Sequence, residues 1–454
     1  MATQTFSLSS PSLAFARDQV AHEHTHNLPR AALANFPSQI HGPTAWSGSD
    51  GDQPVHVLEL SDQDVAVVET ALERFKDAVL TFPAGLGLHG DQVSREYFPL
   101  PGLDSRLDRC ALEVHNGTGI CVIRGLESKY SVEDYMTIYL GISSYLGNRR
   151  GLQDAKGSML SHVTDSKTWT VPLERRHGIH TNFGLPHHCD MGSDILSLHI
   201  RKTAEIGGRL CVASSHTVYN ELARSDPSTL RTLMEPNWPV QASLRQKPPY
   251  TLCPLFEYYE GNLLFSMDPA RLGPVASAPR TAAASKLPPL TAAQLHALGR
   301  VQQAARQHEI CLESEPGDMV YLNSWSTLHA RQPYQDGETF SRHLVRMWLR
   351  NDALGWPVPE SMLMPWGLLA SDRVINRRYP VVPMPVYMEP RYHNTTAAFV
   401  PDDDEEDEDD VGEMAAGDDT TAAQASPTTM TTPTTPATVD HDPRVGAAVV
   451  KDDL

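Results

Sequence analysis

The chain has 454 residues, 40% of them hydrophobic, and a formal net charge of -19 at pH 7. This length and composition predict a globular protein with a substantial core. The segment from residue 401 to the end holds sixteen acidic and two basic residues, which supply fourteen of the nineteen excess negative charges. The remainder has no basic surplus, so we expect no nucleic-acid partner.

The chain divides into three predicted parts: residues 1–40, 41–394 and 395–454. The first is polar and irregular, and the last joins an acidic run to a stretch rich in Thr, Pro and Ala. Neither end can bury enough apolar surface to order itself, so we expect both to be disordered around one central domain.

Cellular location is predicted from signals that the sequence lacks. It shows neither a secretory signal nor an apolar run long enough to cross a membrane, so we expect a cytoplasmic protein without a membrane partner. The six cysteines are scattered and form no Cys-x-x-Cys pair. We expect them to be reduced thiols.

Helix-start signals mark three segments. Ser61–Asp64 and Ser131–Asp134 resemble capping boxes and open periodic runs to about residues 78 and 146. Thr291–Gln294 is a capping box that opens a run to about residue 307. Between the first two helices, residues 119–125 form a short β-rich run between glycines and predict a buried strand.

The second half of the chain reads as short strands separated by turns. Six strands are predicted, at residues 195–200, 210–213, 263–266, 310–313, 319–322 and 344–349. Many short strands with helical insertions favour an α+β or mainly β fold of the jelly-roll type over alternating βαβ units.

His188, Cys189 and Asp190 form a His-x-Asp tripeptide, which is a weak signal in a chain with 20 histidines. In extended backbone, residues two apart project to the same side, so this imidazole and carboxylate can reach one ion. His329 is the best candidate for a third ligand, because it ends the strand and turn that begin at Glu315–Asp318. Two histidines and one carboxylate leave coordination positions open for co-substrate and oxygen, as in non-haem iron(II) oxygenases.

Arg342 and Arg346 lie four residues apart in an apolar segment and would share one face of a strand. Inward-facing guanidinium groups need anionic partners, and their planar shape matches a carboxylate. The pair therefore predicts a site for a carboxylate ligand, with pairing to a buried Asp or Glu of the protein as the alternative.

With these motifs in order, the sequence resembles the TauD/TfdA-like dioxygenases, a family named for taurine and 2,4-dichlorophenoxyacetate oxygenases. The resemblance covers roughly residues 40 to 355. Its matching stretches are residues 188–196, 204–208, 213–222, 315–318, 323–331 and 342–350. Agreement among several linked motifs carries far more weight than any one of them.

The resemblance implies a double-stranded β-helix, or jelly roll, with helical insertions and flanking helices. It implies a dioxygenase that holds Fe(II) through His188, Asp190 and His329 and uses O2 and 2-oxoglutarate to hydroxylate a small, anionic molecule. It assigns Arg342 to the far carboxylate of 2-oxoglutarate, and Arg346 to either substrate or co-substrate. Fold analogy does not choose the substrate.

Two positions depart from the family pattern. Cys189 stands where the family commonly has a small hydroxyl residue, which is either a harmless substitution or a source of oxidation sensitivity. Leu210 stands where the taurine enzyme has a threonine that contacts 2-oxoglutarate. The departure at Leu210 leaves one polar contact missing or supplied elsewhere.

Several alternatives stay open at this point. His187 or Asp194 could replace a metal ligand, and Asn323 and Trp325 could line the pocket or belong to the core. A non-catalytic ligand-binding relative and a zinc-dependent hydrolase or isomerase are the competing functions. The intact ligand set argues against the first, and the paired arginines argue against the second.

Overall fold

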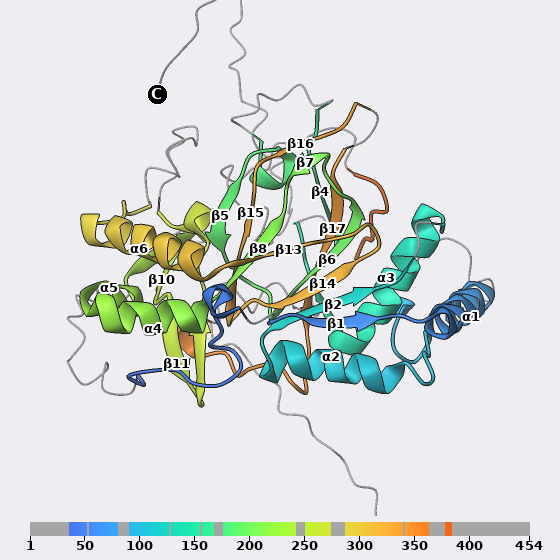
Figure 1. Ribbon diagram of the computed structural model, residues 1–454, viewed down its shortest axis with the longest axis horizontal. Helices are drawn as coiled ribbons and strands as arrows, with labels where there is room; N and C mark the ends of the chain where they lie inside the picture. The colour runs from blue at the N-terminus through green and yellow to red at the C-terminus, as the bar shows by residue number, and fades with distance from the viewer. Residues whose placement is uncertain are drawn as a thin grey trace, which may run out of the picture. The chain divides into compact units, whose positions relative to one another are not determined.

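Two sheets built mostly from antiparallel strands carry the candidate site, and helices lie against both (Figure 1). In the computed structural model, the described residues are 36–51, 54–79, 90–126, 129–154, 157–167, 176–241, 250–273, 287–338, 341–362 and 377–383. The expected disordered segment 395–454 lies outside these residues, as does nearly all of segment 1–40. None of the helices within the described ranges is long and apolar enough to cross a membrane.

The larger sheet has seven strands in the order β1-β2-β14-β6-β17-β3, with β4 also paired to β17. Its strands are β1 (His56–Glu59), β2 (Ile120–Arg124), β3 (Arg149–Gly151), β4 (Ser161–Thr164), β6 (Ile195–Lys202), β14 (Met319–Asn323) and β17 (His343–Arg350). The β1–β2 pair is parallel and the others are antiparallel. Strands distant in sequence thus lie side by side.

The smaller sheet has four strands in the order β13-β8-β15-β5. They are β13 (Ile310–Leu312), β8 (Leu210–Ser214), β15 (Thr327–Arg331) and β5 (Leu185–His188). Three two-stranded ribbons accompany it: β9 (Trp238–Gln241) with β10 (Tyr250–Cys253), β11 (Phe256–Tyr259) with β12 (Asn262–Phe265), and β7 (Ile206–Gly207) with β16 (Tyr334–Gln335).

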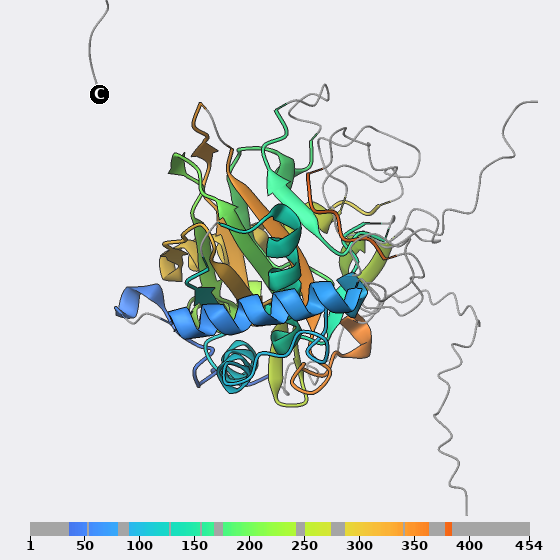
Figure 2. The same cartoon turned by 90° about the vertical axis from the view of Figure 1, so that its right-hand side faces the viewer.

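Three helices cover the larger sheet: α1 (Asp62–Val79), α2 (Asp104–Asn116) and α3 (Val132–Leu146). Figure 2 views the molecule from their side. Their apolar faces share one core with β2, β6, β14 and β17, in which Tyr139, Leu140 and Trp348 are almost fully buried. Burial of this much apolar surface is the main force that holds the layer together.

The other three helices, α4 (Ser215–Ser225), α5 (Pro227–Met234) and α6 (Ala292–His308), lie beside the smaller sheet. They form a second core with the β9–β12 ribbons, which includes Trp238, Phe256 and Phe265. Each sheet therefore has its own helical layer.

The predicted helices begin where the capping signals place them. Ser61 and Asp64 bond each other reciprocally before α1, Ser131 Oγ accepts the Asp134 amide before α3, and Thr291 with Gln294 forms a complete capping box before α6. The six predicted strands of the second half and strand β2 are also present. The expected mixture of antiparallel sheets and helices is confirmed at this level.

The expectation of six reduced cysteines is wrong for two of them. Cys211 and Cys311 form a disulfide, although 100 residues separate them in the sequence. They lie directly opposite each other on the neighbouring strands β8 and β13. The spacing of the cysteines in the sequence could not reveal this pair, because the pairing of β8 with β13 brings the two residues together. Cys110, Cys121, Cys189 and Cys253 are free, as expected, and all four are buried.

Candidate functional site

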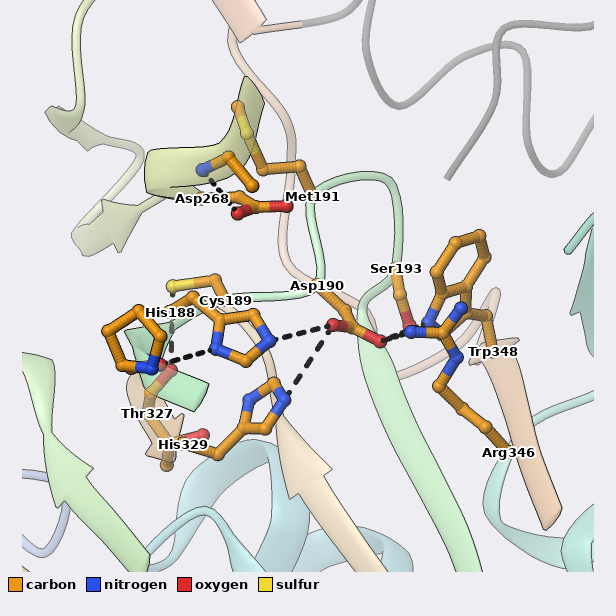
Figure 3. Close-up of polar contacts among 12 residues, drawn as sticks. His188, Cys189, Asp190, Met191, Ser193, Asp268, Thr327, His329, Arg346 and Trp348 are labelled. Atoms are coloured by element: carbon orange, nitrogen blue, oxygen red, sulfur yellow. Dashed lines mark hydrogen bonds and ion pairs between the residues drawn. The ribbon is translucent and has the colours of Figure 1, made fainter. Parts of the chain in front are cut away.

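Three predicted ligand side chains converge at one end of the smaller sheet (Figure 3). His188 ends β5 and lies directly opposite His329 on β15, which places the two ring centroids 4.2 Å apart. Asp190 follows two residues beyond β5, and its Oδ1 lies 3.7 Å from the Nε2 atom of each histidine. The three donor atoms all lie within 4.8 Å of one another, close enough to bind one ion.

The backbone around Asp190 is held by its own short-range bonds. The Cys189 amide donates to Met267 O at 2.7 Å, and the Ser193 amide donates to Asp190 O at 3.2 Å. Gly192 has φ +102°, a conformation that favours glycine, so the chain can turn immediately after the carboxylate. The segment therefore presents Asp190 to the histidines in a fixed direction.

Cys189 does not face the metal-binding atoms. Its Sγ is fully buried and donates weakly to Phe265 O and Thr327 O, each at 3.6 Å. Burial raises the pKa of this thiol, which makes it a poor nucleophile. These contacts favour the harmless small-residue interpretation over an oxidation-sensitive thiol.

Both histidines suit metal binding. His188 Nδ1 lies 2.8 Å from Pro186 O and donates to it, so Nε2 is the nitrogen that faces Asp190 and is placed to bind a metal. Burial, with His188 nearby, lowers the pKa of His329 to about 3, so this ring is neutral at physiological pH. Burial is the largest single effect and would raise the pKa of Asp190, but Arg346, the two histidines and the Trp348 N–H together lower it, so the carboxylate is ionised.

The second oxygen of Asp190 is occupied by neighbours on β17. Arg346 Nη1 donates to Oδ2 at 3.0 Å and Trp348 Nε1 donates to it at 2.6 Å. Oδ1 thus remains on the side of the two histidines. Carboxylates that bind metals are commonly held by outer hydrogen bonds of this kind.

One nitrogen of the Arg346 guanidinium, Nη2, is not used in these contacts. Its Nε donates to Gln153 Oε1 at 3.0 Å. Its Nη2 is buried, and so is Gln153 Nε2; within the described part of the chain neither has a hydrogen-bond partner. An unpaired buried donor is costly, so these two nitrogen atoms are available to an acceptor group.

Arg342 is the second predicted arginine and lies just before β17. Its Nε donates to Gly208 O at 3.2 Å and its guanidinium stacks 5.3 Å from the Tyr334 ring centroid. Its Nη1 is buried and finds no partner among the residues that the structure describes. Burial, with Arg331 nearby, lowers the pKa of Arg342 to about 10, so it still carries its charge.

Gly208 makes room for this arginine. Its φ is +71°, and a Cβ at this position would lie 3.0 Å from both Cδ and Nε of Arg342. Leu210 lines a cavity of about 170 Å³ together with Gly208 and Arg342. Leu210, the apolar residue that departs from the family pattern, therefore lines the same cavity as Arg342.

Sequence reasoning did not select Arg331, Tyr334 or Asp268. Arg331 is buried two residues beyond His329 on β15, and its Nη1, like the Tyr334 hydroxyl, is without a hydrogen bond in the described ranges. The rule that residues two apart in a strand share a face could have found Arg331. Asp268 follows Met267, whose carbonyl holds Cys189, and Figure 3 draws it beside Met191.

The alternative ligands face elsewhere. His187 Nε2 lies 2.9 Å from Glu309 Oε2, and Asp194 contacts Trp325 Nε1 at 3.2 Å and Arg350 Nη1 at 3.1 Å. Asn323 Oδ1 accepts the Trp325 amide, and the Trp325 ring belongs to a small buried cluster. These four residues support the structure around the site.

Comparisons with known proteins assign the part of the chain that holds these residues to one protein family. The model of the "Taurine catabolism dioxygenase TauD, TfdA family" matches residues 85–348. The taurine hydroxylase-like protein SAT17 of Stachybotrys chartarum is 32% identical over 369 residues, which covers 78% of this chain and 92% of that protein. FR-33289 synthase of Streptomyces rubellomurinus is 24% identical over 350 residues, 74% of this chain and 97% of that protein.

Solved structures resemble the chain more distantly. An asparagine oxygenase in complex with Fe(II), a hydroxyasparagine and succinate has a TM-score of 0.49 at 16% identity, and the match covers 66% of this chain and 98% of that one. The non-haem iron oxygenase OrfP with Fe and α-ketoglutaric acid has a TM-score of 0.47 at 15% identity, covering 65% of this chain and 94% of that one.

Proposed function

Because the chain belongs to the TauD, TfdA family and is an iron(II)- and 2-oxoglutarate-dependent dioxygenase, we propose that His188, Asp190 and His329 bind its iron(II) ion. The convergence of two imidazoles and one carboxylate within 4.8 Å is the observation that carries this assignment. One face of the ion would be left for other ligands, as in non-haem iron oxygenases.

Arg342 is the proposed partner of the far carboxylate of 2-oxoglutarate. Its Nη1, the Nη1 of Arg331 and the Tyr334 hydroxyl are buried and unpaired among the described residues, and Arg342 keeps its charge. A planar guanidinium binds a carboxylate with two parallel bonds, which satisfies these donors.

Arg346 has two proposed roles. Its Nη1 positions Asp190, and its unpaired Nη2 is available to an anionic group of the co-substrate or the substrate. Trp348 shares the first role through its indole N–H. Together they fix which carboxylate oxygen turns toward the ion.

The reaction proposed is hydroxylation of a small, anionic organic molecule. When bound, iron(II) supplies oxygen activation, in which 2-oxoglutarate is converted to succinate and carbon dioxide. The protein orients both molecules, keeps the carboxylate ionised and excludes water from the buried arginines. We propose that the two sheets form the double-stranded β-helix of this family around the site.

Family membership favours this function over the two alternatives. A zinc-dependent hydrolase has no use for the unpaired buried donors of Arg331, Arg342 and Arg346, and a non-catalytic relative has no need of an intact ligand set.

Anaerobic reconstitution tests the proposal. Full-length protein with iron(II) and 2-oxoglutarate should develop a weak metal-to-ligand charge-transfer band and, in air, form succinate slowly. Asp190→Ala should lose both signals, whereas Asp352→Ala, a change at a half-exposed carboxylate, should keep them. A wild type without either signal, indistinguishable from Asp190→Ala, contradicts the assignment.

A further inference from the structure

The outer face of the smaller sheet carries a second group of metal-binding side chains. Opposed residues on neighbouring strands point to the same side, and successive residues point to opposite sides. Val212 lies opposite His329 and shares its side of the sheet, so Cys211 points the other way. Cys311, directly opposite Cys211, points there too and is bonded to it.

Two further side chains lie on this outer face. Glu309 immediately precedes β13, and one of its carboxylate oxygens lies within 4.8 Å of both cysteine sulfurs. His187 Nε2 is buried 2.9 Å from Glu309 Oε2 and makes no other polar contact that the structure shows for the described residues. Two sulfurs, a carboxylate and an imidazole therefore gather behind the iron site.

The surrounding elements hold this group in place. Helix α6 packs against β8 and β5. Its Gln302 accepts the His187 amide at 2.9 Å and donates to His187 O at 2.6 Å. The Cα atoms of Cys211 and Cys311 are fixed 3.9 Å apart by the strand pairing. Reduction of the disulfide would thus leave both thiols within reach of one ion.

We propose that the reduced thiolates of Cys211 and Cys311, together with Glu309, bind a divalent ion of the zinc type, and that the disulfide is the oxidised, metal-free form of the site. Two thiolates and a carboxylate are typical zinc ligands, with water completing the tetrahedron. His187 acts on Glu309 and orients the carboxylate, as outer partners of metal ligands do.

The redox step balances with a dithiol as the reductant. The dithiol gives two electrons and two protons to the Cys211–Cys311 bond and becomes a disulfide itself. The two new thiols then release two protons as their sulfurs bind the divalent ion. Oxidation of the metal-free thiols by a disulfide reverses the first step.

Cobalt(II) is the probe of choice, because thiolate ligands give it an intense charge-transfer band in the near ultraviolet. Full-length protein is stripped of metal and reduced anaerobically with a phosphine, which does not compete for the ion. Reduced protein should develop this band as cobalt(II) is added, and oxidised protein should not. His188, Asp190 and His329 contain no thiolate, so occupancy of the iron site cannot produce it.

Matched variants locate the signal. Cys211→Ser should lose the band, and Cys253→Ser, a change at a buried free cysteine, should keep it. Asp190→Ala should also keep it, which separates this site from the proposed iron site. Absence of the band in reduced wild type, or its persistence in Cys211→Ser, overturns the proposal.

Glu309→Gln provides the second measurement if Cys211→Ser does not fold. This variant retains both cysteines and should bind cobalt at least about tenfold more weakly than wild type, since an amide is a poorer ligand than a carboxylate. Unchanged affinity would show that Glu309 is no ligand and would overturn the three-ligand site.

Discussion

The two carboxylate oxygens of Asp190 contact different sets of residues. Oδ1 lies toward His188 and His329, while Oδ2 accepts hydrogen bonds from Arg346 and Trp348. The direction of the proposed metal ligand therefore depends on side chains of another strand, β17. Residues that never touch the ion should affect its binding.

Trp348→Phe tests this dependence. The substitution keeps an aromatic ring in the core but removes the 2.6 Å hydrogen bond to Asp190 Oδ2. We expect iron(II) affinity to fall about 10- to 100-fold, the usual effect of losing an outer partner of a metal ligand. Iron titration followed by the 2-oxoglutarate charge-transfer band measures it.

The control is Trp356→Phe, which removes an indole hydrogen bond to the His115 carbonyl in a separate buried cluster. Its iron affinity should equal that of wild type. Equal losses in both variants would show a general effect on stability and not a positioning role for Trp348.

Arg342→Met should weaken 2-oxoglutarate binding while iron binding persists. Methionine fills the buried space without charge, so the far carboxylate loses a charged hydrogen bond worth about 1.5 to 3 kcal/mol, or roughly 10- to 100-fold in affinity. Isothermal titration of the iron-loaded protein measures the change. Arg231→Met, at an exposed position on α5, should leave affinity unchanged, and a full-affinity Arg342→Met protein would rule out the assignment.

At the scale of elements, local signals predicted the helices α1, α3 and α6, each of which begins with a side-chain cap. Helices α4 and α5 were not predicted, although Ser214 and Asp226 cap them. Helix α2 was missed because Leu103 precedes it and provides no capping hydrogen bond. Strands β5 and β15 were missed because His188, His329 and Arg331 interrupt the alternation of apolar and polar residues. The polar side chains of the site interrupt the hydrophobic pattern from which a strand is predicted, so strands that carry site residues are harder to predict.

Contacts in the site could be predicted only between residues that are close in the sequence. His188 and Asp190 are close in sequence, and the i, i+2 rule places them together. The contacts of Arg346 with Asp190 and of Cys211 with Cys311 join residues that are 156 and 100 positions apart in the sequence. Composition and spacing carry no information on such pairs.

Thr291→Ala should destabilise the protein by about 1 kcal/mol, because it removes the side-chain bond to the Gln294 amide at the start of α6. Urea unfolding measures the loss. Thr70→Ala is the control: this exposed threonine lies inside α1, where alanine should be neutral or slightly favourable. A Thr291→Ala protein as stable as the control would mean that α6 does not depend on its cap.

At the scale of the whole molecule, the proposed chemistry is confined to one part of the chain. The family match ends at residue 348 and the last described residue is 383, whereas fourteen excess negative charges lie beyond residue 400. The net charge of the chain therefore says little about the site, whose buried side chains include several arginines.

Deletion of residues 395–454 should leave 2-oxoglutarate turnover and its KM within about twofold of wild type. We expect the segment to be disordered from its composition, so it should contribute little to folding, and the field of its charges is screened beyond about 8 Å at physiological ionic strength. Steady-state kinetics at two salt concentrations measure this. A large rise in KM that disappears at high salt would show that the tail acts on the site.

Strand β5 lies at the edge of the smaller sheet, where its described partner is β15 and the pairing is irregular between His329 and Arg331. An edge strand held on one side opens more readily than a central one. An ion bound by His188 and His329 would tie this edge to its neighbour, and iron affinity would add to the local opening free energy. Amide hydrogen exchange along β5 should thus slow when iron(II) binds. The ion would then stabilise the pairing of β5 with β15 in addition to its part in the reaction.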